Sequence, residues 1–257
     1  MTLASVGFAV RRQLAHLGEA TRLFVRLCAL SPVVLRRFGL VRDQIFFLGN
    51  LSLAIIAVSG LFVGFVLGLQ GYYTLQRYGS AEALGLLVAL SLVRELGPVV
   101  TALLFAGRAG TALTAEIGLM KAGEQLAAME MMAVDPERRV LGPRFWGGLI
   151  AMPLLAAVFS AVGIIGGWGV GVVMIGVDAG SFWSQMQSGV EVWQDVGNGV
   201  VKSAVFGLTV TFVALYQGYM AHPTPEGVSH ATTRTVVMAS LLVLALDFVL
   251  TAWMFSI

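Results

Sequence analysis

The chain has 257 residues, of which 58% are hydrophobic and 12% are charged, and its formal net charge is +2. With a mean hydropathy of +0.86, this composition excludes an ordinary soluble domain and indicates a polytopic membrane protein. The basic residues lack interleaved aromatic side chains, so nucleic-acid binding has no support.

At the N-terminus, residues 3–28 have apolar side chains at helical spacing and charged side chains on the opposite side. This pattern predicts an amphipathic helix that lies in the membrane plane, and a helix packed on a soluble partner is the alternative. Pro32 is expected to end the helix, because proline disfavours helix in the preceding residue. Residues 1–44 are therefore assigned to an interfacial region and residues 45–257 to the membrane domain.

Five apolar runs reach the length of about 20 residues that crosses a bilayer as a helix. They lie near residues 45–70, 84–106, 145–176, 200–220 and 236–256. The sequence therefore predicts an all-α membrane protein with five spans. The third run exceeds a perpendicular crossing and is rich in glycine at its outer end, so we expect tilt or a break there.

Lysine and arginine are unevenly distributed between the loops. Seven arginines precede residue 45, five basic residues fall within 107–144 and one within 221–235, whereas the other loops hold only Arg77 and Lys202. Because cytoplasmic loops carry the excess of Lys and Arg, the N-terminus is predicted to be cytoplasmic. After five spans the C-terminus then lies outside, as does the segment 178–199.

Span one carries Gly60, Gly64 and Gly68, a spacing of small residues that lets another helix approach closely. The partner helix could belong to the same chain or to a second copy. Tyr78 follows this span with two further tyrosines nearby, as expected of an aromatic belt at the membrane interface. Lining the mouth of a pocket is the alternative for these tyrosines.

The polar segment between spans two and three is rich in Ala, Leu, Met, Glu and Gln, which favour helix. Lys121, Glu124 and Gln125 are expected on one face of a short cytoplasmic helix, with Leu119 and Leu126 roughly opposite. Its methionines offer an adaptable contact surface. The segment is predicted to dock a cytoplasmic partner or to cap the bundle as a structured loop.

Groups for catalysis are scarce, and the chain is not predicted to be an enzyme. None of the three histidines has a metal-ligand spacing, so no metal site is predicted. The phosphate-binding pattern GxxxxGK[ST] is absent. Any ATP-driven work therefore needs another polypeptide.

Arg94 and Glu95 are adjacent charges inside the second apolar run. A charge at mid-membrane costs about 3 kcal/mol, so such residues face a bundle interior or a watery cavity. Neighbours in a helix point about 100° apart, so at least one of the two needs another partner. Pro98 is expected to kink the helix beside them. The alternatives are a polar spot in a cavity and a buried ion pair that locks helices together; Asp247, the other intramembrane charge, is the predicted partner of Arg94.

Four stretches, "RELGPVVTALLFAGRAGTALTAEIG" (94–118), "EQLAAMEMMAVDPERRV" (124–140), "GVSHATTRTVV" (227–237) and "LDFVLTA" (246–252), closely resemble the MlaE-type (YrbE) permeases. These are membrane subunits of phospholipid-transporting ABC systems in Gram-negative inner membranes. The resemblance covers nearly the whole chain. His230 stands where a small residue is commoner.

The resemblance implies that two copies associate and that each docks on an ATPase subunit through a coupling helix at about 116–134. It implies a STAS-domain protein on the ATPase and a hexamer of MCE-domain subunits on the periplasmic side. ATP and Mg²⁺ would be bound by the ATPase, with no cofactor in this chain. ATP binding would squeeze an outward-facing phospholipid pocket formed by spans one, two and five.

Residue roles follow from the same resemblance and from the patterns above. The expected lipid-binding residues are Arg94, Glu95, Leu67, Leu75 and Tyr78. The expected ATPase-coupling residues are Glu116, Lys121, Glu124, Gln125 and Met129. The expected helix-packing residues are Gly60, Gly64, Gly68, Pro98 and Asp247.

Two other classes of protein compete with this interpretation. A secondary transporter or channel for an amphipathic solute would be expected to show a proton relay or inverted repeats, but five spans do not divide into equal halves. An inert scaffold that anchors soluble subunits would explain the cytoplasmic helix. It would not explain why Arg94, Glu95 and Pro98 occur together.

Overall fold

The computed structural model describes residues 3–255 of the chain, without the side chains of residues 3–10, 12, 13, 16, 35 and 255. The C-terminal Ile257, predicted to lie outside, falls beyond the described residues, as do the side chains of Leu3, Val6 and Val10 on the predicted apolar face of the first helix. Residues 3–255 contain helices and connecting turns, with no strand.

The helices follow one another with few connecting residues. The α-helices are α1 (Leu3–Ala29), α2 (Ser31–Leu35), α3 (Phe38–Arg77), α4 (Leu84–Leu90), α5 (Gly97–Phe105), α6 (Thr111–Ala122), α7 (Gln125–Met131), α8 (Gly142–Trp168), α9 (Ala179–Gly189), α10 (Gly197–Met220) and α11 (Pro225–Phe255). The short 3₁₀ helix is η1 (Ala81–Ala83), and the π-helical turns are η2 (Ser91–Leu96), η3 (Ala106–Gly110), η4 (Glu137–Leu141), η5 (Gly169–Met174) and η6 (Val192–Val196).

Five helical stretches are long and apolar enough to cross a membrane. They are Phe38–Arg77, Ala81–Ala122, Glu137–Met174, Val192–Met220 and Pro225–Met254. The five predicted spans are therefore confirmed, although every helix is longer than the apolar run that predicted it. The helices continue into polar flanking residues, which hydropathy does not mark; α3, for example, already begins at Phe38.

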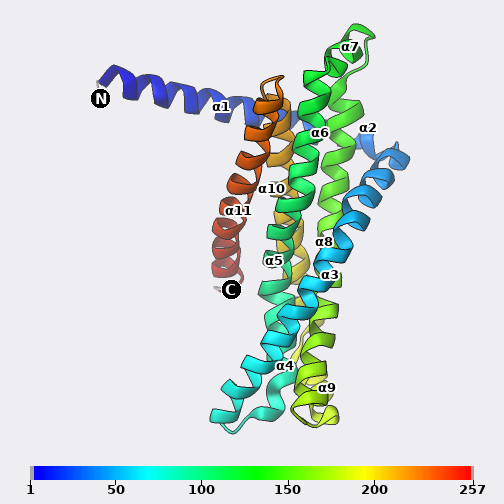
Figure 1. The fold of residues 1–257 in the computed structure, drawn as a ribbon, viewed down its shortest axis with the longest axis vertical. Helices are drawn as coiled ribbons and strands as arrows, with labels where there is room; N and C mark the ends of the chain where they lie inside the picture. The colour runs from blue at the N-terminus through cyan, green and yellow to red at the C-terminus, as the bar shows by residue number, and fades with distance from the viewer. Residues whose placement is uncertain (1–2, 256–257) are drawn as a thin grey trace.

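The long helices run side by side, and α1 lies across them (Figure 1). α7 projects at the same end of the bundle as α1, which we call the α7 end, and α9 lies at the opposite α9 end. Leu23 and Leu27 of α1 pack in an apolar cluster with Leu215 of α10, whereas Leu14 and Leu17 are exposed. An exposed apolar face on a helix across the bundle fits a helix that lies in a membrane plane.

Glycines bring α3 and α8 close together. A Cβ atom added at Gly60 would lie 2.8 Å from the carbonyl oxygen of Phe159, and one added at Gly68 would lie 2.9 Å from that of Gly167. At Gly64 the added Cβ would overlap the carbonyl oxygen of Gly163. The glycine stripe of span one therefore faces α8 of the same chain, so its close approach does not require a second copy.

The single helix predicted over about 116–134 is wrong, because the structure divides this segment in two. α6 ends at Ala122, Glu124 adopts a left-handed conformation with φ 56°, and α7 begins at Gln125. The break turns Leu126 back onto the bundle, where it is 6% exposed, while Leu119 is 58% exposed. The two leucines do not share a face, because burial of Leu126 decides the direction of α7.

At the α9 end, where tilt or a break of span three was expected, the helix changes from α-helical to π-helical turns within the continuous stretch Glu137–Met174. The regular turns of α8 end at Trp168 and continue as the π-helical η5. The following segment forms α9 and then η6. Asp178 caps α9, since its carboxylate accepts a hydrogen bond of 2.6 Å from the backbone N–H of Ser181.

Replacing Gly64 with alanine tests the contact between α3 and α8. The added Cβ has no room against the backbone of Gly163, so we expect Gly64→Ala to lower the free energy of unfolding by about 2 kcal/mol. Gly49→Ala is the matched control, because a Cβ at Gly49 of the same helix meets nothing within 4 Å. Unfolding by SDS titration in detergent measures both variants. Equal stability of the two would contradict the packing described here.

Candidate functional site

Charged side chains from four segments meet inside the bundle. η2 supplies Arg94 and Glu95, η6 supplies Asp195, α10 supplies Lys202, and α11 supplies Asp247 and Thr251. We call these six residues the ionic cluster. They adjoin a cavity of ≈ 60 Å³, which is lined by Arg94, Glu95, Gln194, Asn198, Lys202, Thr251 and Met254.

Lys202 is the centre of the ionic cluster and is only 1% exposed. Its Nζ atom donates hydrogen bonds of 2.7 Å to Glu95 Oε2 and 2.6 Å to Thr251 Oγ1. Asp247 Oδ1 lies 3.2 Å from the same nitrogen, as an ion pair without hydrogen-bond geometry. The placement of Lys202 in an outer loop was wrong, because α10 begins at Gly197 and carries the lysine into the bundle.

Arg94 pairs with Asp195 at a distance of 2.5 Å between Nε and Oδ1. Asp195 is 2% exposed and also accepts a hydrogen bond of 2.8 Å from the backbone N–H of Glu191. The predicted pairing of Arg94 with Asp247 is therefore wrong. Because Arg94 and Glu95 point in different directions from η2, each reaches a different segment, and Asp247 is left to Lys202.

The backbone around the ionic cluster departs from a regular α-helix. The N–H of Gly97 bonds to the carbonyl of Leu92, five residues earlier, and Pro98 follows at the start of α5. Pro98 was expected to kink the helix. The structure has a π-helical turn just before it, and this turn carries both Arg94 and Glu95. α10 comes close to this turn, because a Cβ at Gly199 would overlap the carbonyl oxygen of Val93.

The other predicted lipid-binding residues do not reach the cavity within one chain. Leu67 and Leu75 pack partly buried against the main apolar core, and Tyr78 is 80% exposed at the end of α3. A cavity of ≈ 60 Å³ has room for only a few water molecules. The cavity within one chain is therefore too small for an acyl chain, whereas the outer side of α11 exposes Leu241 and Phe248.

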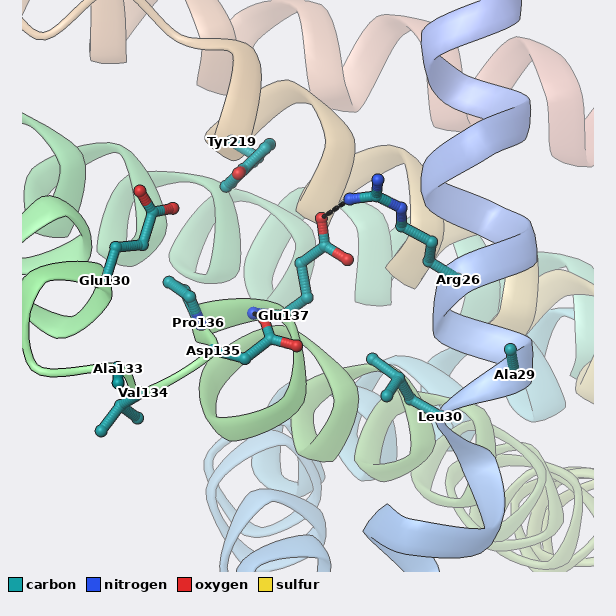
Figure 2. A pocket seen from close by; sticks show the side chains of 10 residues that line it. All are labelled: Arg26, Ala29, Leu30, Glu130, Ala133, Val134, Asp135, Pro136, Glu137 and Tyr219. Atoms are coloured by element: carbon teal, nitrogen blue, oxygen red, sulfur yellow. Dashed lines mark hydrogen bonds and ion pairs between the residues drawn. The ribbon is translucent and has the colours of Figure 1, made fainter.

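A second hollow lies at the α7 end, between α1, the segment after α7 and the end of α10 (Figure 2). Its volume is ≈ 600 Å³. Arg26 of α1 forms an ion pair of 3.0 Å with Glu137 of η4 across one side of it, and Tyr219 of α10 lies nearby. Glu130 and Asp135 add two further carboxylates. The ion pair connects α1 to the segment that follows α7.

The predicted coupling residues fall into two groups. Glu116 and Lys121 of α6 are engaged inside the chain, because Glu116 pairs with Arg144 at 2.5 Å and Lys121 donates a hydrogen bond of 2.7 Å to the carbonyl of Tyr219. Glu124 and Gln125 are exposed and Met129 is half-buried. Exposed apolar surface for a partner comes instead from α7 and its end, above all from Met131 and Met132, which are 85% and 67% exposed.

Lys202 and Asp195 are the site residues that sequence reasoning missed. Lys202 lies at the start of the fourth apolar run. At this position, composition alone does not show whether a residue belongs to a loop or to a span. A signal was present, because Glu95 was left without a cation once Arg94 was assigned to Asp247. Gly199 and Ser203 beside Lys202 also mark a helix face that tolerates close packing.

Fold and site together define an all-α polytopic membrane protein with a charged cluster buried among its spans, the arrangement of a transport permease. Residues 41–253 match the family model described as Permease MlaE. The chain belongs to the MlaE permease family.

Individual relatives agree with the family model. The chain is 61% identical over 226 residues to the intermembrane phospholipid transport system permease protein MlaE of Haemophilus influenzae, covering 88% of this chain and 87% of the relative. It is 34% identical to a probable ABC transporter permease protein of Rickettsia typhi, covering 85% and 84% of the two chains. It is 28% identical to the chloroplastic protein TRIGALACTOSYLDIACYLGLYCEROL 1 of Arabidopsis thaliana, covering 81% and 59%.

Replacing Lys202 tests whether it holds the ionic cluster together. Lys202→Met leaves Glu95 and Asp247 without their cation, so we expect the free energy of unfolding to fall by about 3 kcal/mol. Adding Asp247→Asn should recover part of this loss, because it removes one of the unpaired carboxylates. Arg77→Met, at an exposed position, is expected to change stability by less than about 0.5 kcal/mol. A Lys202→Met protein as stable as wild type in denaturant titration would refute the role.

Proposed function

We propose that this chain is the permease subunit of an ATP-driven ABC transporter that moves phospholipids between membranes and so maintains lipid asymmetry. The observation that carries the proposal is the 61% identity over 88% of the chain to a relative named for intermembrane phospholipid transport. A buried ionic cluster beside exposed apolar helix faces supports it, because a phospholipid needs both a polar and an apolar environment.

The ionic cluster would set the polarity at the lipid headgroup in this proposal. Arg94 is the accessible cation of the cluster, with a side chain that is 32% exposed, and Glu95 is 35% exposed. A zwitterionic or anionic headgroup could exchange contacts with these two residues while Lys202 stays buried. Acyl chains would lie on outer apolar faces and against Leu67, Leu75 and Tyr78 once a second copy of the chain completes the pocket.

The proposed assembly contains two copies of this chain, each bound to an ABC ATPase that holds ATP and Mg²⁺. A STAS-domain protein on the ATPase and a periplasmic hexamer of MCE-domain subunits complete it, as the family resemblance implies. The α7 end is the side proposed to bind the ATPase, because α7 projects there with Met131 and Met132 exposed. ATP binding would move α7 and, through the ion pair of Arg26 with Glu137, also α1.

The proposed location is the inner membrane of a Gram-negative cell, with the α7 end and the N-terminus in the cytoplasm and the C-terminus on the periplasmic side. The distribution of basic residues supports this orientation. With Lys202 inside the bundle, Arg77 is the one basic residue left among the outer loops of the described chain. The difference in the number of basic residues between the α7 end and the outer loops is therefore larger than the sequence suggested.

Neutral replacement of the two accessible charges tests the proposed transport site. In the complex reconstituted with its ATPase, we expect Arg94→Gln and Glu95→Gln to slow ATP-dependent transfer of phospholipid by roughly tenfold, the effect of losing one charged hydrogen bond. Arg77→Gln is the control. Variants that assemble normally and transfer lipid at the wild-type rate would remove the ionic cluster from the mechanism. ATP-independent transfer by the wild-type protein would favour a secondary transporter.

A charge on α7 tests the proposed ATPase contact. We expect Met131→Asp to reduce recovery of the ATPase with the tagged permease at least roughly tenfold, because a buried unpaired carboxylate in an interface costs more than 1.4 kcal/mol. Met174→Asp is the matched control, since Met174 is 76% exposed and follows α8 toward the α9 end. If both variants recover the ATPase equally, α7 is not the docking element.

A further inference from the structure

A groove separates the end of α10 from the start of α11 at the α7 end of the bundle. Its volume is ≈ 760 Å³. The residues that line it are Tyr216, Gln217, Met220, Ala221, His222, Gly227, His230, Ala231, Arg234 and Met238. We call it the α10–α11 groove. None of its residues belongs to the ionic cluster or to the hollow of Figure 2, and Met220 also borders a smaller hollow lined by Arg22 and Arg26.

The side chains of the groove change character along α11. His230, Arg234 and Met238 follow one another at intervals of four residues and therefore occupy one face of the helix. Because α11 begins at the α7 end and runs along the bundle (Figure 1), Met238 lies about 12 Å deeper than His230 at 1.5 Å per residue. The groove thus carries two histidines near the bundle end, Arg234 one turn deeper than His230, and Met238 at its deep end.

Arg234 is the one residue of the groove lining that carries a formal positive charge. None of the residues that line it is acidic, while His222, His230 and Arg234 are exposed to it. Within residues 3–255, no carboxylate lies within ion-pair distance of Arg234. The backbone N–H groups at the start of α11 add partial positive charge at the same end, beside the carboxylate of Glu226 in the first turn.

The connection between α10 and α11 holds His222 against this end of the groove. Gly227 is needed for this arrangement, because a Cβ there would lie 2.6 Å from the carbonyl oxygen of His222. The backbone N–H of Gly227 also donates a hydrogen bond of 3.1 Å to Thr224 Oγ1. At the deeper end, Gln217 Nε2 contacts Met238 Sδ at 3.0 Å and joins the two helices.

We propose that the α10–α11 groove binds an anionic phospholipid of the leaflet at the α7 end, with its phosphate on Arg234 and the two histidines. The fork of an arginine side chain matches the oxygens of a phosphate group. Met220, Ala231 and Met238 then contact the glycerol and the first part of the acyl chains. The depth fits a resident lipid, because five apolar spans place this end of α11 among headgroups, and α1 lies across the bundle at the same end.

This lipid site is distinct from the proposed transport site. The ionic cluster uses Asp247 and Thr251, near the other end of α11. A lipid in the groove would instead hold α10 and α11 together at the end proposed to bind the ATPase. Its binding does not require ATP or lipid transfer, so the two proposals fail independently.

Site-specific cross-linking tests the proposal. The full-length chain carries the photoreactive residue p-benzoylphenylalanine at Met220, which lines the groove and is 39% exposed. It is placed in nanodiscs with equal amounts of phosphatidylglycerol and phosphatidylcholine, and mass spectrometry identifies the cross-linked lipid. We expect roughly fivefold more phosphatidylglycerol, the effect of about 1 kcal/mol from one cation near the surface. Arg234→Gln should abolish most of this preference, and Arg234→Lys should retain it.

Two controls separate the groove from general attraction of anionic lipid. The same photoreactive residue at Phe46, 68% exposed near the start of α3, should show no headgroup preference, and Arg36→Gln, at an exposed arginine outside the groove, should leave the preference at Met220 unchanged. Equal labelling by both lipids at Met220, an unchanged preference in Arg234→Gln, or a cross-link to a second copy of the chain would overturn the proposal. Loss of the preference in millimolar inorganic phosphate, but not in chloride of equal ionic strength, would assign the groove to a soluble phosphate instead.

Discussion

The structure depends on the compensation of one buried positive charge. Lys202 is 1% exposed and sits between Glu95 and Asp247, which belong to two other spans. A lysine inside a membrane bundle is stable only when paired, because the cost of removing its charge from water is several kcal/mol. Spans two, four and five must therefore come together at this level of the bundle, and α10 cannot shift along its axis without separating charges.

Local departures from the α-helix make this convergence possible. The π-helical turn η2 presents Arg94 and Glu95 to different neighbours, and the π-helical turn η6 presents Asp195 to Arg94. Gly199 and Gly64 have no Cβ atom, so the backbone of a neighbouring helix approaches each of them to a distance at which a Cβ would collide. Glycine and π-helical turns thus position the charges, and the charges in turn hold these irregular segments in place.

α11 contributes residues both to the α10–α11 groove and to the ionic cluster. Arg234 lies near its start, in the α10–α11 groove, and Asp247 and Thr251 lie near its end, in the ionic cluster. Between these positions α11 packs along α10 and α6, and Thr235 shares a hydrogen bond of 2.8 Å with Thr114 of α6.

The sequence by itself determined the five spans, the amphipathic first helix and the need of Arg94 and Glu95 for partners inside the bundle, because hydropathy and the cost of a membrane charge are properties of local composition. Only the tertiary structure decided which charges pair. Lys202 looked like a loop residue, and Asp247 was assigned to Arg94, since partners 45 to 107 residues apart leave no local signal. The break at Glu124 was also decided by packing, because burial of Leu126 against the bundle outweighs the helix propensity of its neighbours.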